Sequence, residues 1–309
     1  MGWPELSAAR DGGTIATLHL ASQIVGKAEV ALLPWRNHGW HAALHLHPRG
    51  LRTEPLHGAG EPFELGLDLV EGAVTFDDAR GSRAVPLAGR TTAELWEGVT
   101  GLLAWSGRSV RLHPAPNEIE PAIPFAEDRR PRDYDPDSAR RLLAALLEAD
   151  RVLRLFRSSF LGKASPVHFF WGSFDLAVTR FSGRPAPRHP GGIPRLPDAV
   201  TREAYSHEVS SAGFWPGGAG MAGGPFFYSY AYPAPTGFAS ANVEPEQARF
   251  DEALGEFVLG YEAVRAAPDP DAALMEFLGS TYAAAAALAR WDRAALECET
   301  GHPRVPRAV

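Results

Sequence analysis

The chain of 309 residues contains a single cysteine, Cys298. It therefore cannot form an intramolecular disulfide bond, and zinc sites that need two or four cysteines are excluded. An excess of basic charge is also missing, because 30 Lys and Arg residues stand against 37 Asp and Glu residues, a formal net charge of −7. Broad nucleic-acid binding requires a basic surface, so we expect no nucleic-acid partner.

Long apolar runs and a targeting segment are lacking as well. The longest apolar stretch covers residues 282–289 and is alanine-rich, whereas a membrane span needs about 20 apolar residues. Residues 1–6 show no basic region followed by an apolar run. We therefore expect a cytoplasmic protein with no membrane partner. The 45% hydrophobic content is typical of a globular core and excludes a fully disordered chain.

Several motifs that would name a reaction are absent. The glycine-rich run 217–224 lacks the Gly-Lys-Ser/Thr ending of a phosphate-binding loop. No parallel strand–helix–strand unit surrounds it, so it is not a dinucleotide-binding motif. The Gly-x-Ser-x-Gly motif of hydrolases and the His-Glu-x-x-His zinc motif do not occur. The sequence therefore does not specify a reaction, and its candidate site residues lie in polar clusters.

Apolar periodicity predicts a mixture of helices and strands. Helical spacing with capping residues or glycine stops, such as Gly26, predicts one set of segments. These are 13–27, 91–105, 137–161, 198–208, 251–265 and 271–288. Alternating or continuous apolar residues predict strands. These lie within 40–47, 63–76, 110–112, 167–181 and 226–232, and residues 213–224 are expected to form a loop.

A proline-rich, charged segment at 113–136 is the best boundary in the chain, because proline blocks helices. We predict an α+β fold of two weakly similar halves, 1–112 and 137–297, followed by a tail at 298–309. Each half has antiparallel strands with flanking helices, and the two pack as one compact unit. The similarity indicates a duplication or arises by chance. If it is a duplication, the crevice between the halves is the expected ligand site.

The densest polar and aromatic segment is 165–184. It places His168, Trp171, Asp175 and Arg180 among further aromatic residues. Burial among aromatic rings would shift the pKa values of the imidazole and the carboxyl, as acid–base catalysis requires. The alternative is a core strand with a hydrogen-bonded histidine and an Asp–Arg pair.

A second cluster joins Tyr205, His207 and Glu208 to Trp215 and a glycine-rich loop. Two groups that can carry protons would lie beside mobile backbone. The alternative is a histidine at a helix C-terminus, where the helix dipole favours it.

A third cluster comprises His38, His41, His45 and His47. On a strand, His45 and His47 share a face, which is compatible with one divalent metal if a third ligand comes from elsewhere. The alternative is a solvated surface with histidines as polar residues.

The runs 162–184, 205–211 and 213–218, with 3–6 and 37–41, resemble the signature of a bacterial family known as a domain of unknown function. The resemblance spans nearly the whole chain. That family has no established activity, cofactor or catalytic residue, so the resemblance implies no chemistry. His45 and His47 depart from the family pattern, which leaves His38 and His41 as the metal candidates.

These clusters predict an enzyme that acts on a small-molecule ligand between the halves. His168 and His207 would carry protons, and Asp175 or Glu208 would orient them or accept protons. An anionic group would be held by Arg180. The pocket walls would be Trp171, Tyr205 and Trp215, and a divalent metal at His41 is an open variant. The alternatives are a non-catalytic binding or sensor protein with an aromatic pocket, and an interaction scaffold with an exposed aromatic patch.

Overall fold

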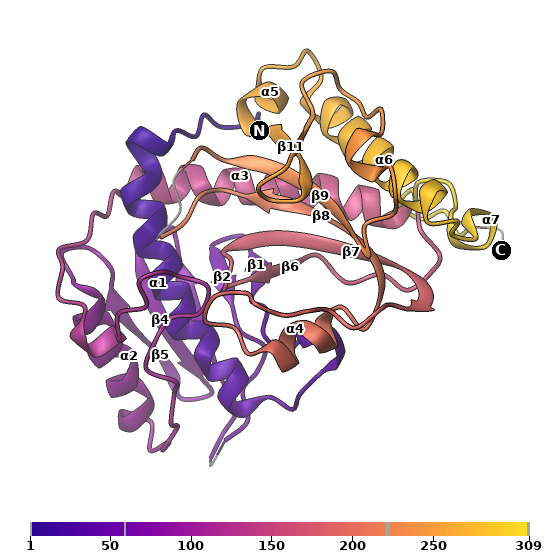
Figure 1. Cartoon of the computed structure of the whole chain (residues 1–309). Helices are drawn as coiled ribbons and strands as arrows, with labels where there is room; N and C mark the ends of the chain where they lie inside the picture. The colour runs from indigo at the N-terminus through magenta and orange to yellow at the C-terminus, as the bar shows by residue number, and fades with distance from the viewer. Residues whose placement is uncertain (1, 59, 220–222, 308–309) are drawn as a thin grey trace.

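The computed structural model describes residues 2–58, 60–219 and 223–307 and arranges them as two antiparallel sheets with flanking helices (Figure 1). The first sheet runs in chain order: β1 (His45–His47), β2 (Gly50–Arg52), β3 (Phe63–Asp68), β4 (Ala73–Asp78) and β5 (Gly81–Pro86). The second sheet has the order β10-β11-β9-β8-β7-β6. Its strands are β6 (His168–Phe170), β7 (Asp175–Pro185), β8 (His207–Trp215), β9 (Phe226–Tyr232), β10 (Arg249–Asp251) and β11 (Glu256–Gly260). The predicted α+β class is confirmed.

Local capping signals determine where several helices begin. Thr91 and Glu94 form a reciprocal capping box at α2, and Asp135 caps α3, which begins at Pro136. The α-helices are α1 (Ala8–Leu32), α2 (Thr92–Trp105), α3 (Pro136–Ser158), α4 (Asp198–Ala204), α5 (Tyr261–Arg265), α6 (Pro270–Leu288) and α7 (Arg293–Leu296). Short 3-10 turns are η1 (Asn37–Gly39), η2 (Phe125–Glu127) and η3 (Phe238–Ser240). Within the described ranges, no helix has both the length and the apolar character needed to cross a membrane.

Helix α1 is the central helix of the fold and contacts α2, α3 and β3 (Figure 1). Nearly every residue from Asp11 to Glu29 is buried, which explains why its sequence lacks a clear polar face. The predicted helix end at Gly26 is wrong, because α1 continues to Leu32. A β-carbon at Gly26 would overlap the ring of Trp171. Glycine is there to allow this close packing, not to end the helix.

The two sheets meet through a short antiparallel bridge. Leu44 and Phe169 exchange backbone hydrogen bonds of 2.8 and 3.1 Å. One hydrophobic core runs from Leu6 to Trp291 and includes residues from both sheets. Residues 113–136 form an irregular segment whose regular structure is limited, in the described chain, to η2. The division into halves 1–112 and 137–297, and their duplication, stay predictions.

The second sheet has two different faces, which decides where a ligand can bind. Helices α3 and α6 contact strands β7, β8 and β9 from one side. The residues of β7 that lie on the other side are Asp175, Ala177, Thr179 and Phe181. We call this second side the cavity face. Helix α4 and the turn η1 lie over it.

Four predicted elements are wrong. The helix predicted over 198–208 ends at Ala204, because His207 and Glu208 begin β8, which pairs with β7. Residues 251–265 form the hairpin of β10 and β11 and only one short helix, because Phe250 pairs with Phe257 across the strands and β11 pairs with β9. Residues 110–112 belong to no strand. The expected loop at 213–224 begins only after Trp215, because β8 pairs along its length with β9, and residues 220–222 of it lie outside the described residues. In each case pairing between distant segments, or its absence, decided the structure.

Candidate functional site

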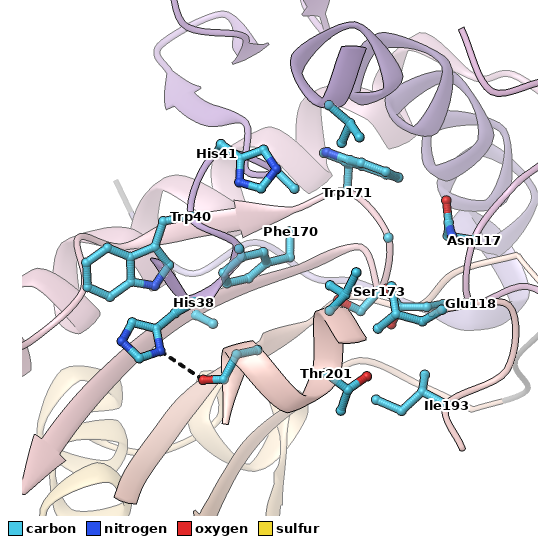
Figure 2. A pocket seen from close by; sticks show the side chains of 18 of the residues that line it. His38, Trp40, His41, Asn117, Glu118, Phe170, Trp171, Ser173, Ile193 and Thr201 are labelled. Carbon is cyan, nitrogen blue, oxygen red and sulfur yellow. Dashed lines mark hydrogen bonds between the residues drawn. The ribbon is translucent and has the colours of Figure 1, made fainter. Parts of the chain in front are cut away.

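A cavity of about 670 Å³ opens on the cavity face of the second sheet (Figure 2). Its walls come from the end of α1, the segment 35–42, the strands β6 to β9, helix α4 and two irregular segments near residues 117 and 195. A smaller hollow of about 280 Å³ shares Glu118, Asp175 and Tyr228 with it. Pockets of this size bind small organic molecules.

Asp175 begins β7 and lies where the two hollows meet. Its carboxylate accepts hydrogen bonds from the Ser173 hydroxyl and from the Tyr228 hydroxyl. Burial raises the pKa of Asp175, and these two hydrogen bonds oppose the rise. A β-carbon at Gly213 on the neighbouring strand would overlap both the Leu176 carbonyl and the Tyr228 hydroxyl. Glycine at this position therefore makes room for the contact between Tyr228 and Asp175.

Glu118 and Glu256 add two more carboxyl groups at the same end of the site. Burial, and secondly the charge of Asp175, raise the pKa of Glu118 to about 7, while Lys27 opposes the rise. Burial and the charges of Asp175 and Asp251 raise the pKa of Glu256 to about 8. We call Glu118, Asp175 and Glu256 the carboxyl end. Groups with pKa values near neutrality can both donate and accept protons at physiological pH.

The backbone that carries Glu118 is held by helix α1. The side-chain amide of Gln23 donates to the Asn117 backbone carbonyl at 2.7 Å, and the Asn117 backbone N–H donates to the side-chain oxygen Oε1 of Gln23 at 2.8 Å. The Lys27 ammonium donates to the Asn117 side-chain oxygen. Burial lowers the pKa of Lys27 to about 8. These contacts fix the position of Glu118 from a segment 94 residues away in sequence.

His19 holds the opposite side of the carboxyl end. Its Nε2 lies 2.9 Å from the Gly172 carbonyl, and the Ala219 N–H donates to its Nδ1 at 3.1 Å. The neutral ring with hydrogen on Nε2 satisfies both contacts. Burial lowers the pKa of His19 to about 4. His19 is therefore a neutral positioning residue for the turn between β6 and β7.

Three tyrosines surround the carboxyl end. The hydroxyls of Tyr205 and Tyr230 lie 2.8 Å apart, and the rings of Tyr228 and Tyr230 stack with their centres 6.1 Å apart. Burial raises the pKa of all three phenols. They are therefore neutral hydrogen-bonding groups near physiological pH.

The rest of the wall is largely aromatic and apolar. It includes Trp35, Trp40, Phe170, Trp171, Phe181, Ile193, Leu196 and Val200. Two polar atoms in this wall, Nε1 of Trp171 and Oγ1 of Thr201, have no hydrogen-bond partner among the described residues. Their residues are only 6% and 1% exposed. Buried polar groups in folded proteins are nearly always paired, so these two atoms are candidate ligand contacts.

Backbone strain is concentrated around the cavity. Four non-glycine residues there adopt left-handed backbone conformations: His38, Glu118, Phe174 and Arg195, with φ between 57° and 61°. Phe174 lies between the lining residues Ser173 and Asp175, and the other three line the cavity themselves. Each such residue costs on the order of 1–3 kcal/mol. Strain of this kind clusters at functional sites.

The two metal candidates, His38 and His41, line the outer part of the cavity. His38 Nδ1 donates to the Ala204 carbonyl at 3.0 Å (Figure 2), and its Nε2 lies 2.5 Å from the Lys163 ammonium. The Arg36 N–H donates to His41 Nδ1 at 3.2 Å. Burial lowers the pKa of both imidazoles. Across the described chain, no three or more His, Cys, Asp or Glu side chains are grouped to hold a metal ion.

The other predicted site residues separate into two groups. Asp175, Trp171 and Tyr205 line the cavity, and Trp215 lines the smaller hollow. Because side chains alternate along a strand, Arg180 lies on the opposite face of β7 from Asp175. The Arg180 guanidinium donates to the Phe156 carbonyl and to Ser159, on and beside α3. It therefore does not reach the cavity.

His168, His207 and Glu208 line neither hollow. His168 is buried with its ring centre 5.8 Å from that of Trp40, and burial lowers its pKa to about 4. The ring of His207 lies 5.7 Å from that of His38. Glu208 accepts a hydrogen bond of 2.6 Å from Arg184. The catalytic roles predicted for His168, His207 and Glu208 stay predictions, because none of these residues lines the cavity.

Residues that sequence reasoning missed include Gln23, Lys27, Asn117 and Glu118. A signal existed in α1, where His19, Gln23 and Lys27 recur every four residues and share one helix face within an apolar segment. Glu118 carried no such signal, because it lies in the proline-rich segment without periodicity.

Residues 3–298 match a family described as "Family of unknown function (DUF5996)". No curated protein and no solved structure matches the chain. The match covers nearly the whole sequence and agrees with the resemblance noted in its aromatic and glycine-rich runs. The chain therefore belongs to the family of unknown function DUF5996.

Proposed function

We propose that the protein is an enzyme that transfers protons to and from a small molecule bound in the cavity. The observation that carries this proposal is the pair Asp175 and Glu118 where the two hollows meet, each with a raised pKa. Two coupled carboxyl groups can divide the roles of general acid and general base, because the charge of one disfavours ionisation of the other.

The surroundings of the pair support the same proposal. Asp175 is oriented by Ser173 and Tyr228, and Glu118 is held by the contacts of Asn117 with α1. Hydrogen bonds therefore orient the Asp175 side chain and hold the backbone that carries Glu118, and acid–base groups require such support. The strained backbone at Glu118 and Phe174 is a further sign of a functional site. The proposal gives no role to His168, His207 or a metal.

A second candidate function is binding without catalysis, as in a sensor. The largely aromatic and apolar wall, with Trp35, Trp40 and Phe170, favours it. Both functions require a ligand in the cavity, and they differ in whether the carboxyl groups act on it.

Turnover in heavy water separates the two. The protein is incubated in D₂O with a mixture of cell metabolites, and mass spectrometry follows each compound. We expect a compound that is consumed, or gains deuterium, with the unchanged protein but not with Asp175→Asn or Glu118→Gln. Glu127→Gln is the control, since Glu127 is exposed and lines neither hollow. If a compound binds but stays unchanged with every protein, the molecule is a binder and the enzyme proposal is wrong.

A further inference from the structure

We infer that the ligand of this cavity carries an ammonium group, which binds at the carboxyl end, on an aromatic body that bears an oxygen acceptor. The inference rests on the proposed function insofar as it places the ligand in the same cavity. It adds the chemical class of that ligand.

The first argument is the imbalance of charge. The carboxyl end brings together Glu118, Asp175 and Glu256, and Lys27 is the one ammonium whose charge acts on Glu118. Lys27 itself is engaged by Asn117 and lies 5.1 Å from the ring centre of Trp171. Burial raises the pKa of all three carboxyl groups, and the charge of Asp175 adds to the rise at Glu118 and Glu256. A ligand cation among them would favour their ionisation and would be attracted in return, whereas an anion would be repelled.

The second argument is the aromatic surroundings of these carboxyl groups. Tyr205, Tyr228 and Tyr230 line both hollows and contact one another. The faces of aromatic rings attract organic cations, and cages of aromatic rings are used to recognise ammonium groups. We therefore expect carboxyl groups surrounded by these rings to bind a ligand ammonium more tightly than a ligand hydroxyl.

The third argument comes from the wall and does not depend on charge. Nε1 of Trp171 and Oγ1 of Thr201 are buried in residues that line the cavity, and neither has a hydrogen-bond partner in the described chain (Figure 2). Both atoms can donate a hydrogen bond. Water in the cavity barely touches them, so a ligand oxygen would satisfy them once neighbouring side chains shift to admit it. The body of the ligand therefore carries an oxygen acceptor as well as an aromatic or apolar surface.

An anionic ligand group has less support. The guanidinium expected to hold it, that of Arg180, lies on the opposite face of the sheet and bonds to the Phe156 carbonyl. Two arginines line the cavity: Arg195 is paired with Glu120 at 3.0 Å, and Arg111 is exposed and has no ion pair among the described residues. An anion at Arg195 would have to compete with an existing partner, and Arg111 would attract it from an exposed position, where water weakens the attraction.

Three probes of the same size test the charge preference: tyramine, tyrosol and 4-hydroxyphenylacetate. They share one phenol ring and differ in carrying an ammonium, a hydroxyl or a carboxylate. Calorimetric titration of the full chain is expected to show tyramine binding at least about tenfold tighter than tyrosol, which corresponds to about 1.4 kcal/mol. The carboxylate probe is expected to bind most weakly.

Variants locate the preference at the carboxyl end. Asp175→Asn is expected to reduce the preference for tyramine over tyrosol from about tenfold to less than about threefold. The free-energy difference between the two probes would then fall by more than half. Glu256→Gln is a second test, because its side chain makes no hydrogen bond with the described residues whose loss would threaten folding. Glu252→Gln is the matched control, since Glu252 is exposed on the same hairpin and lines neither hollow. Circular dichroism confirms that each variant is folded.

The outcomes separate this inference from the proposed function. If tyrosol or 4-hydroxyphenylacetate binds as tightly as tyramine, and Trp171→Phe weakens that binding, the cavity is a ligand site but the ammonium assignment is wrong. A tyramine preference that survives in both Asp175→Asn and Glu256→Gln also overturns the assignment. If none of the probes binds, the assignment fails while the heavy-water test of turnover still stands by itself.

Discussion

Replacing Glu118 by glutamine is expected to stabilise the protein, and the gain is expected to grow with pH. In the unfolded chain this carboxyl ionises near its ordinary pKa of 4.5, whereas in the folded protein it keeps its proton until about pH 7. Between these values the folded state binds more protons, so the stability of the unchanged protein falls as pH rises. Glutamine cannot ionise, so the variant lacks this loss.

The magnitude follows from the same two pKa values. The rise from 4.5 to about 7, at about 1.4 kcal/mol for each pKa unit, gives a gain on the order of 3 kcal/mol above pH 7. The gain vanishes below the unfolded pKa, where both states are protonated. For a chain of 309 residues, 3 kcal/mol corresponds to an increase in Tm of about 5 °C.

Urea unfolding at about pH 5 and about pH 8 measures this difference. Glu127→Gln is the control, because it removes the same charge from an exposed position nine residues away and should show no gain that grows with pH. If Glu118→Gln changes the free energy of unfolding equally at both pH values, the carboxyl is not buried as described. The reasoning about the carboxyl end would then be wrong.

Two further substitutions test how the site is built. Gly213→Ala is expected to cost about 1–3 kcal/mol in urea unfolding, because the added β-carbon overlaps the Tyr228 hydroxyl; unchanged stability would contradict this packing. Gln23→Leu is expected to cost about 2–4 kcal/mol, because it leaves the N–H and carbonyl of Asn117 without partners. A cost below about 0.5 kcal/mol, which is typical of an unimportant surface site, would show that α1 does not hold this segment.

The parts of the fold that depend on local signals were predictable. Thr91 and Asp135 begin helices as their capping chemistry predicts, and the strand over 226–232 follows its alternating pattern. The segment 251–265 was not predictable in this way. Its apolar spacing favoured a helix, but β11 pairs with β9, which lies some 30 residues earlier. A pattern within one segment does not report pairing with a distant strand.

The same distinction between local and distant signals applies to the site. Trp171, Asp175 and Tyr205 were found from the density of polar and aromatic residues in single segments. Glu118 was not found, because its role arises from contacts between an irregular segment and a helix about 90 residues earlier. His168 was also chosen from a single segment, and it is buried beside Trp40 without lining the cavity. Its catalytic role stays a prediction.

The left-handed residues around the cavity have a consequence for protein engineering. A sequence selected only for thermal resistance would place glycine at positions 38, 118, 174 and 195 and would relieve about 1 kcal/mol of steric repulsion at each. This chain instead keeps an imidazole, a carboxyl, a phenyl ring and a guanidinium there. Consensus or stability-driven redesign should therefore leave these four positions untouched, because the most profitable stabilising changes would erase the chemistry of the pocket.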